Sequence, residues 1–266
     1  MANKKKGYDL NAADRRRNLL IQVGLTAVVI LFAVGLLLLI LKPWEPKPTK
    51  PSVTGPPAGT VMPITVAVPD KLAKDAAGKP KVVLSMFEDF LCPACGAFER
   101  NFGLTVKQLI DTGAVQADYY MVALLDSPQR QFYSSRAGSA AYCVAEFDTS
   151  PTKESFQKFH SALYANQPDE VTGPFPTDDD LVQRARDAGA AGTNVSDCIL
   201  GDKYLDMVRG LVRATGLKGT PTIKINNQEV DMSTVHSPQD LINKVNEASA
   251  AAPASPAPAP VPAPAP

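Results

Sequence analysis

Two cysteines separated by two residues, Cys92 and Cys95, are the side chains of this sequence best suited to chemistry; they lie in FEDFLCPACGAFE at 87–99. Two thiols at this spacing can bind a metal ion, form an inert structural bond, or exchange disulfides with other proteins. A disulfide that closes so short a loop removes little entropy from the unfolded chain and would stabilise the fold poorly. The spacing therefore favours thiol–disulfide exchange.

The two other cysteines, Cys143 and Cys198, raise the alternative of a zinc site. Structural zinc sites usually combine two close pairs of ligands. This chain has one close pair, two cysteines that are far apart, and two histidines, His160 and His236. We therefore expect neither a metal site nor a cofactor.

The segments around the close pair predict how it is positioned. Residues 81–90 are rich in β-branched and apolar side chains, which predicts a buried strand, and residues 93–113 predict a helix that begins with a proline. Cys92 would then lie at the helix N-terminus, where free backbone amides and the helix dipole stabilise a thiolate. We expect Cys92 to be the attacking sulfur and Cys95, about one turn further along, to be its resolving partner.

The remaining elements follow as a second strand at 114–125, a helical block, a hairpin at 220–230 and a final helix. Asn226 and Asn227 can adopt the left-handed turn of the hairpin. The helices are predicted at 129–147, 150–167, 177–189, 202–216 and 237–248.

Capping signals precede three of these helices. Ser150 followed by Pro151 predicts an N-cap and a first helical residue. Thr177 and Asp180 have the spacing of a capping box, and Ser237 is the expected cap of the last helix.

An uncharged apolar run occupies residues 19–41. As a helix it spans roughly 30 Å of hydrocarbon. A cleaved signal peptide is the alternative, but its apolar core would be about 7–15 residues long and would end at small residues. More basic residues precede the run than follow it, which predicts a cytoplasmic N-terminus and an extracytoplasmic domain. The basic residues are Lys4, Lys5, Lys6, Arg15, Arg16 and Arg17 before the run, and Lys42, Lys47 and Lys50 after it.

Prolines divide the rest of the chain, because many of them lie on either side of the globular part. The balance of 27 basic and 27 acidic residues does not favour nucleic acid as a partner. The predicted parts are a basic cytoplasmic N-terminus at 1–18, a transmembrane anchor at 19–41, a proline-rich spacer at 42–58, a globular domain at 59–250 and a disordered Ala/Pro tail at 251–266.

The FEDFLCPACGAFE motif, the helical block and GLKGTPTIKIN at 216–226 together resemble the DsbA-like thioredoxin-fold thiol:disulfide oxidoreductases of the membrane-anchored bacterial type. The resemblance covers about residues 60–248. It implies an α/β thioredoxin fold with a helical domain inserted at about 128–217, preceded by one transmembrane helix. It also implies a cis peptide bond between Thr220 and Pro221, which leaves the Thr220 backbone free to pair with an extended substrate.

Two features of the family pattern are missing. Strongly oxidising members carry a histidine where this chain has Ala94, so we expect a less favoured thiolate and a milder potential. Many members carry a buried acid at the position of Met86, whereas this chain has Glu88 and Asp89 nearby. Either acid could relay the proton of Cys95, or could simply be solvated at the strand end.

Cys143 and Cys198 both fall in the helical block. Each could be a buried free thiol. Unpaired thiols are a liability in an oxidising compartment, so we expect a structural Cys143–Cys198 disulfide.

The sequence thus predicts a membrane-tethered, extracytoplasmic thiol:disulfide oxidoreductase that introduces disulfides by exchange at Cys92–Cys95. The resemblance implies reduced exported proteins as substrates, and reoxidation by a DsbB-like or VKOR-like membrane oxidase linked to quinone. The alternatives are a disulfide reductase or isomerase of the same fold, or a non-catalytic thioredoxin-like module that binds peptides.

Overall fold

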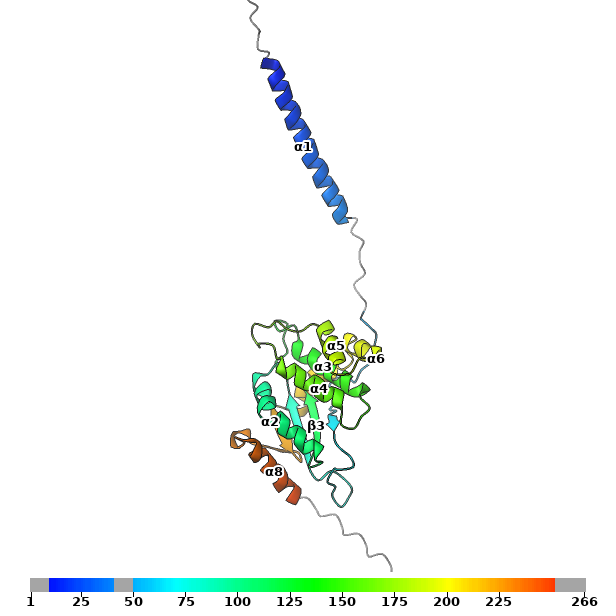
Figure 1. Ribbon diagram of the computed structural model, residues 1–266, viewed down its shortest axis with the longest axis vertical. Helices are drawn as coiled ribbons and strands as arrows, with labels where there is room; N and C mark the ends of the chain where they lie inside the picture. The colour runs from blue at the N-terminus through cyan, green and yellow to red at the C-terminus, as the bar shows by residue number, and fades with distance from the viewer. Residues whose placement is uncertain (1–9, 41–49, 252–266) are drawn as a thin grey trace, which may run out of the picture. The chain divides into compact units, whose positions relative to one another are not determined.

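The computed structural model describes residues 10–40 and 50–251, which belong to two separate units. The first contains helix α1 (Leu10–Ile40), whose segment Arg17–Gly35 is long and apolar enough to cross a membrane (Figure 1). Three segments lie outside the described residues. They are residues 1–9 of the predicted cytoplasmic N-terminus, residues 41–49 at the end of the predicted anchor and in the spacer, and residues 252–266 of the predicted tail.

The second unit is built around a five-stranded sheet in the order β1-β3-β2-β4-β5. The central strands β2 and β3 are parallel, and Glu88 at the end of β2 is paired with Met121 at the end of β3. Strands β1 and β4 flank them in antiparallel orientation. The strands are β1 (Ile64–Val66), β2 (Val83–Glu88), β3 (Gln116–Met121), β4 (Thr222–Ile225) and β5 (Gln228–Glu229).

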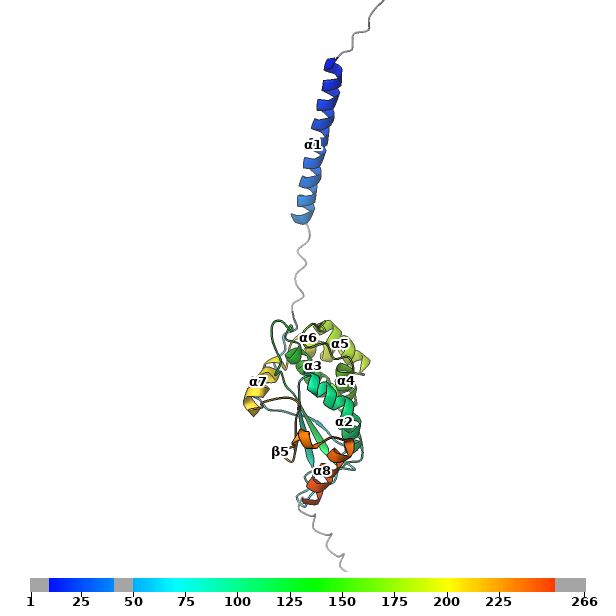
Figure 2. The same ribbon diagram turned by 90° about the vertical axis from the view of Figure 1, so that its left-hand side faces the viewer.

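Helix α2 (Pro93–Asp111) provides the crossover that the parallel strands β2 and β3 require. It packs against the last helix, α8 (Pro238–Ala251), and α7 (Leu205–Thr215) lies on the other side of the sheet (Figure 2). Five of the six residues of β2 are buried, as expected for a central strand that is covered on both faces.

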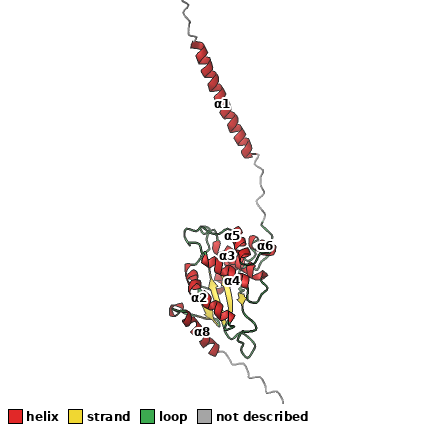
Figure 3. Cartoon of the chain, in the orientation of Figure 1, coloured by secondary structure: helices red, strands yellow, loops and turns green. Residues whose placement is uncertain are grey.

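The helical block lies together at one end of the sheet (Figure 3). Helix α3 is buried along most of its length and packs close to α7, because a Cβ atom at Gly138 would lie only 2.8 Å from Val208. The other helices of the block are α4 (Glu154–Ala165), α5 (Asp178–Asp187) and α6 (Thr193–Leu200), with α3 at Tyr133–Phe147. The order of strands and helices agrees with the sequence-based expectation, except that β1, α6 and the 3-10 helix η1 (Met232–Thr234) were not predicted.

The N-terminus of α4 differs from the prediction. The helix begins at Glu154, so Ser150 is not its N-cap. The Asp148 carboxylate accepts hydrogen bonds from Ser150 and from the backbone N–H of Ser155, which satisfies the first turn in another way. The predicted Thr177–Asp180 capping box at α5 is confirmed.

Residues 50–58 lie against the helical block, although they were predicted to be part of a spacer. Lys50 pairs with Asp178 and Asp202, at 3.4 and 2.5 Å. A Cβ atom at Gly201 would collide with Val53, at 2.3 Å. This part of the predicted spacer therefore packs on the domain, because a proline-rich segment can cover an existing surface even though it builds no core of its own.

Candidate active site

Cys92 is the N-cap of α2, and Pro93 is the first residue of the helix, as predicted. Both Cys92 and Cys95 are free thiols. The Cys92 side chain keeps 8% of its surface exposed and Cys95 has none. A substrate can therefore reach the sulfur of Cys92 more easily than that of Cys95.

The loop before β4 lies against Cys92, although it is 128 positions away in the sequence. The Cys92 thiol donates a hydrogen bond to the backbone oxygen of Thr220 at 3.3 Å, and the Thr220–Pro221 peptide bond is cis. The structure thus brings the predicted substrate-binding segment next to the predicted catalytic cysteine.

The two thiols differ strongly in acidity. A hydrogen bond from Cys95, together with the Thr220 side chain and the backbone amides of Ala94 and Cys95, lowers the pKa of Cys92 to about 5 in spite of burial. Burial and the hydrogen bond to Cys92 raise the pKa of Cys95 above its ordinary value. The Cys95 thiol and, to a smaller extent, the helix terminus therefore favour a Cys92 thiolate without a histidine at position 94.

Asp89 is fully buried, so it is not solvated at the strand end. Its carboxylate accepts hydrogen bonds from the backbone N–H groups of Leu91 and Leu125, at 2.9 and 2.8 Å. Burial raises the pKa of Asp89 to about 6. Both of its oxygens thus connect the loop before the cysteines to the chain that follows β3.

Glu88 is also fully buried, and the solvated alternative is wrong for it as well. Its Oε2 atom lies 3.0 Å from Nε2 of His160, and its side chain also shares a hydrogen bond with that of Glu99. Burial raises the pKa of Glu88 to about 8, and the charge of Cys92 contributes. Glu88 also raises the pKa of Cys95, so the two groups act on each other.

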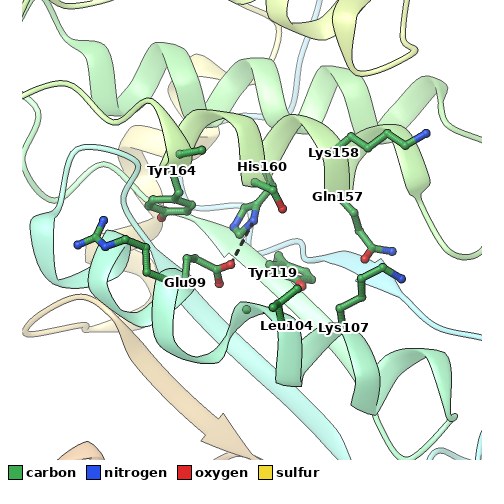
Figure 4. Close-up of a pocket in the computed structure, with 12 residues that line it drawn as sticks. Glu99, Leu104, Lys107, Tyr119, Gln157, Lys158, His160 and Tyr164 are labelled. Atoms are coloured by element: carbon green, nitrogen blue, oxygen red, sulfur yellow. Dashed lines mark ion pairs between the residues drawn. The ribbon is translucent and has the colours of Figure 1, made fainter. Parts of the chain in front are cut away.

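Three residues near the site were not predicted from the sequence. His160 and Glu99 face each other in a pocket of about 510 Å³ between α2 and α4 (Figure 4). Gln167 donates hydrogen bonds to the backbone oxygens of Phe90 and Cys92. Glu99 lies on α2 itself, about one turn beyond Cys95. No local pattern marks His160 and Gln167, because they reach the cysteines only through the packing of the helical block on α2.

Cys143 and Cys198 form a disulfide that joins α3 and α6. Both residues are buried. This bond is enclosed within the helical block.

A thioredoxin family model matches residues 76–244. The crystal structure of reduced DsbA from Mycobacterium tuberculosis is 44% identical to this chain, with a TM-score of 0.65, and the match covers 73% of this chain and 95% of that one. The chain belongs to the DsbA-like thioredoxin family. The reduced disulfide bond oxidoreductase DsbG from Mycobacterium tuberculosis is also 44% identical, with a TM-score of 0.63 and coverage of 71% and 93%. No curated protein matches the chain.

The predicted fold class is confirmed: this DsbA-like chain has an α/β thioredoxin fold with an inserted helical domain. It is a thiol:disulfide oxidoreductase, as are the DsbA structures that it resembles. The DsbA-like site has one acidic thiol with a small exposed surface and one fully buried thiol, and two buried carboxyl groups lie nearby.

Proposed function

We propose that this DsbA-like oxidoreductase introduces disulfides into exported proteins on the outer side of a membrane. The observation that best supports disulfide formation over disulfide reduction is the pKa of Cys92, which is lowered to about 5. A stabilised thiolate favours the reduced enzyme, so its disulfide is a correspondingly stronger oxidant. The lack of a histidine at position 94 still predicts a milder potential than that of the strongest oxidants in the family.

The reaction consists of two exchanges. A substrate thiolate attacks Sγ of Cys92 in the Cys92–Cys95 disulfide, which forms a mixed disulfide and releases Cys95 as a thiolate that takes up a proton. A second substrate thiolate then attacks the substrate sulfur of the mixed disulfide. The substrate leaves with a disulfide, and the two electrons remain on the enzyme as the reduced cysteine pair.

The segment Thr220–Pro221 is proposed to bind the substrate chain beside Cys92. The backbone oxygen of Thr220 accepts the hydrogen bond of the Cys92 thiol, which places this backbone next to the reacting sulfur. An extended substrate segment can pair with such a backbone by strand addition.

Glu88 and Asp89 are the proposed groups for the proton of Cys95. Glu88 is the better placed of the two, because its charge acts on Cys95, whereas both oxygens of Asp89 accept backbone hydrogen bonds. A buried carboxyl group with a pKa of about 8 can both give and take a proton near neutral pH.

The apolar helix α1 is proposed to be an uncleaved anchor with the N-terminus in the cytoplasm. Six basic residues before the apolar run and three after it support this orientation. Reduced exported proteins are then the substrates, and a DsbB-like or VKOR-like membrane oxidase linked to quinone reoxidises the enzyme.

A reductase or isomerase is the second candidate, since the chain is 44% identical both to DsbG and to DsbA from Mycobacterium tuberculosis. A non-catalytic module that binds peptides is the third. The three candidates predict different redox behaviour of the Cys92–Cys95 pair.

The test is the redox equilibrium of the full-length protein in detergent micelles against glutathione, followed by thiol trapping with Cys95→Ser. A potential above about −200 mV, with substrates trapped on Cys92, supports the disulfide-forming enzyme. A potential near or below about −270 mV supports a reductase. A pair that resists exchange supports the binding module, and Cys92→Ser is the trapping control.

A further inference from the structure

A buried cluster of two acids and one histidine lies behind the cysteine pair. Glu88 comes from β2, Glu99 from α2 and His160 from α4. One carboxyl oxygen of each acid and one imidazole nitrogen all lie within 4.8 Å of one another. Oε2 of Glu88 is 3.0 Å from Nε2 of His160, and Oε2 of Glu99 is 3.9 Å from Nδ1. The imidazole thus faces one carboxyl group with each of its nitrogens.

The cluster runs from the protein interior towards a pocket. The Glu88 side chain is fully buried, that of His160 is 4% exposed, and that of Glu99 is 11% exposed. Glu99 and His160 line the pocket between α2 and α4, and Glu88 does not (Figure 4). Accessibility therefore rises in the order Glu88, His160, Glu99.

Aromatic side chains fix the orientation of the His160 ring. Four rings surround it with centroid separations of 5.0 to 5.6 Å; they belong to Phe90, Tyr119, Phe156 and Tyr164. Because the ring is held on several sides, its two nitrogens stay directed at the two carboxyl groups.

The cluster retains protons near neutral pH. Burial raises the pKa of Glu88 and of Glu99 to about 8, and burial lowers the pKa of His160. Tyr119 and Tyr164 face the cluster, and burial raises the pKa of both well above the ordinary value, so they stay neutral.

Basic side chains do not neutralise the two carboxyl groups. Arg100, Lys107 and Lys158 line the same pocket, but none of them forms an ion pair with Glu88 or Glu99 among residues 50–251. Protons are then the available counter-charge for these acids.

We propose that His160 and Glu99 are positioning residues that conduct protons between Glu88 and the pocket, so that buried Cys95 exchanges its proton with solvent in every turnover. The inference rests on the proposed exchange reaction. It adds a route for the proton, since Cys95 has no exposed surface through which it could reach water directly.

The proton balance of the route is as follows for attack by a substrate thiolate. The electron pair of the broken Cys92–Cys95 bond passes to Cys95 Sγ, which takes a proton from Glu88. Glu88 regains a proton from Nε2 of His160, Nδ1 takes one from Glu99, and Glu99 is reprotonated from the pocket. Reoxidation of the cysteine pair reverses each transfer.

The experiment follows release of glutathione by Cys95 from a mixed disulfide at Cys92, in the full-length protein in detergent, between pH 5 and 9. We expect Glu99→Gln and His160→Asn to lower this rate roughly 10- to 100-fold at neutral pH, as is typical when acid–base assistance is lost. We also expect the rate of both variants to rise in proportion to hydroxide. Added imidazole or acetate should restore part of the rate, because a small buffer can enter the pocket beside position 99.

The controls separate a proton route from a structural role. Lys158→Gln changes another side chain that lines the same pocket. His236→Asn removes the other histidine of the sequence. Both variants should keep the wild-type pH profile of the rate. The pKa of Cys92, read from thiolate absorbance, should stay the same in Glu99→Gln. Glu99→Gln is nearly isosteric, so it decides the matter even if His160→Asn does not fold.

Two results would overturn the proton route. One is a wild-type rate and pH profile in Glu99→Gln. The other is a divalent metal ion bound in equal amount to the protein, whose removal by a chelator changes the rate, since such an ion would occupy the oxygens that the proton needs. If wild-type Cys92 forms no mixed disulfide at all, the proposed exchange function itself fails, which is a distinguishable outcome.

Discussion

Cys92 and Cys95 lie three positions apart at the start of α2, whereas Cys143 and Cys198 lie 55 positions apart and join α3 to α6 in a disulfide. All four residues are buried or nearly so. The surroundings differ: helix amides, Thr220 and buried acids adjoin the first pair, and packed helices enclose the second. Burial alone therefore does not decide whether a cysteine pair reacts.

The two cysteine pairs also differ in the length of the loop that a disulfide between them closes. A bond across two intervening residues constrains the unfolded chain little, so it can open and close at small cost in stability. A bond across 55 positions constrains the unfolded chain much more. Four predictions test this division between a reactive pair and a stabilising pair.

The largest effect is expected from Cys92→Ser. Without its thiolate the exchange rate should fall by at least about a thousandfold, because the nucleophile is lost. The measurement is the oxidation rate of a reduced peptide with two cysteines. The double variant Cys143→Ala/Cys198→Ala should keep most of the rate, and similar losses in both variants would contradict the division.

The stability of the fold should depend more on the Cys143–Cys198 pair than on the Cys92–Cys95 pair. Removing the Cys143–Cys198 bond by Cys143→Ala/Cys198→Ala is expected to cost about 4 kcal/mol in the free energy of unfolding, from the length of the loop that it closes. Urea denaturation measures the loss. Removal of Cys92 and Cys95 should cost less, and the reverse order would show that the helical block does not depend on its disulfide.

The stability of the reduced enzyme should depend on pH more than that of the oxidised enzyme. The pKa of Cys92 is lowered to about 5, so its thiolate stabilises the reduced protein fully above the unfolded pKa near 9, and this term is lost as pH falls through 5. The buried acids are present in both redox states, so their contributions to the pH dependence of stability largely cancel when the two states are compared.

The reduced protein should therefore gain stability relative to the oxidised one between pH 5 and 7, by up to about 3 kcal/mol. Thermal unfolding of both redox states over this range measures the difference. A constant difference would mean that the pKa of Cys92 is not lowered in the folded protein.

The smallest effect is expected from Thr220→Ala. Removal of the Thr220 hydroxyl, which helps to lower the pKa of Cys92, should raise this pKa from about 5 towards 6, whereas the backbone oxygen of residue 220 stays in place. Thiolate absorbance gives the value. The matched control is Thr177→Ala, which removes the cap of α5 and should cost about 1 kcal/mol of stability without changing the pKa of Cys92.

Local sequence patterns were sufficient to predict most of the elements. The proline after Cys92 marked the start of α2, the apolar run before it marked β2, and the paired asparagines marked the hairpin turn, where both have positive φ. Such signals depend on neighbours within a few residues, so they are available from sequence alone. The three missed elements are short: β1 and the 3-10 helix η1 have three residues each, and α6 has eight.

The position of the reactive thiol at a helix N-terminus was therefore determined by the sequence itself, since the backbone amides of α2 act on Cys92 wherever that helix is placed. Glu88 and His160 are 72 positions apart, and only the packing of the helical block on α2 brings them together. That packing also excludes water from Glu88, and the exclusion of water raises its pKa. The tertiary structure alone decided the state of these acids, because desolvation depends on every segment that covers a group and not on its neighbours in the chain.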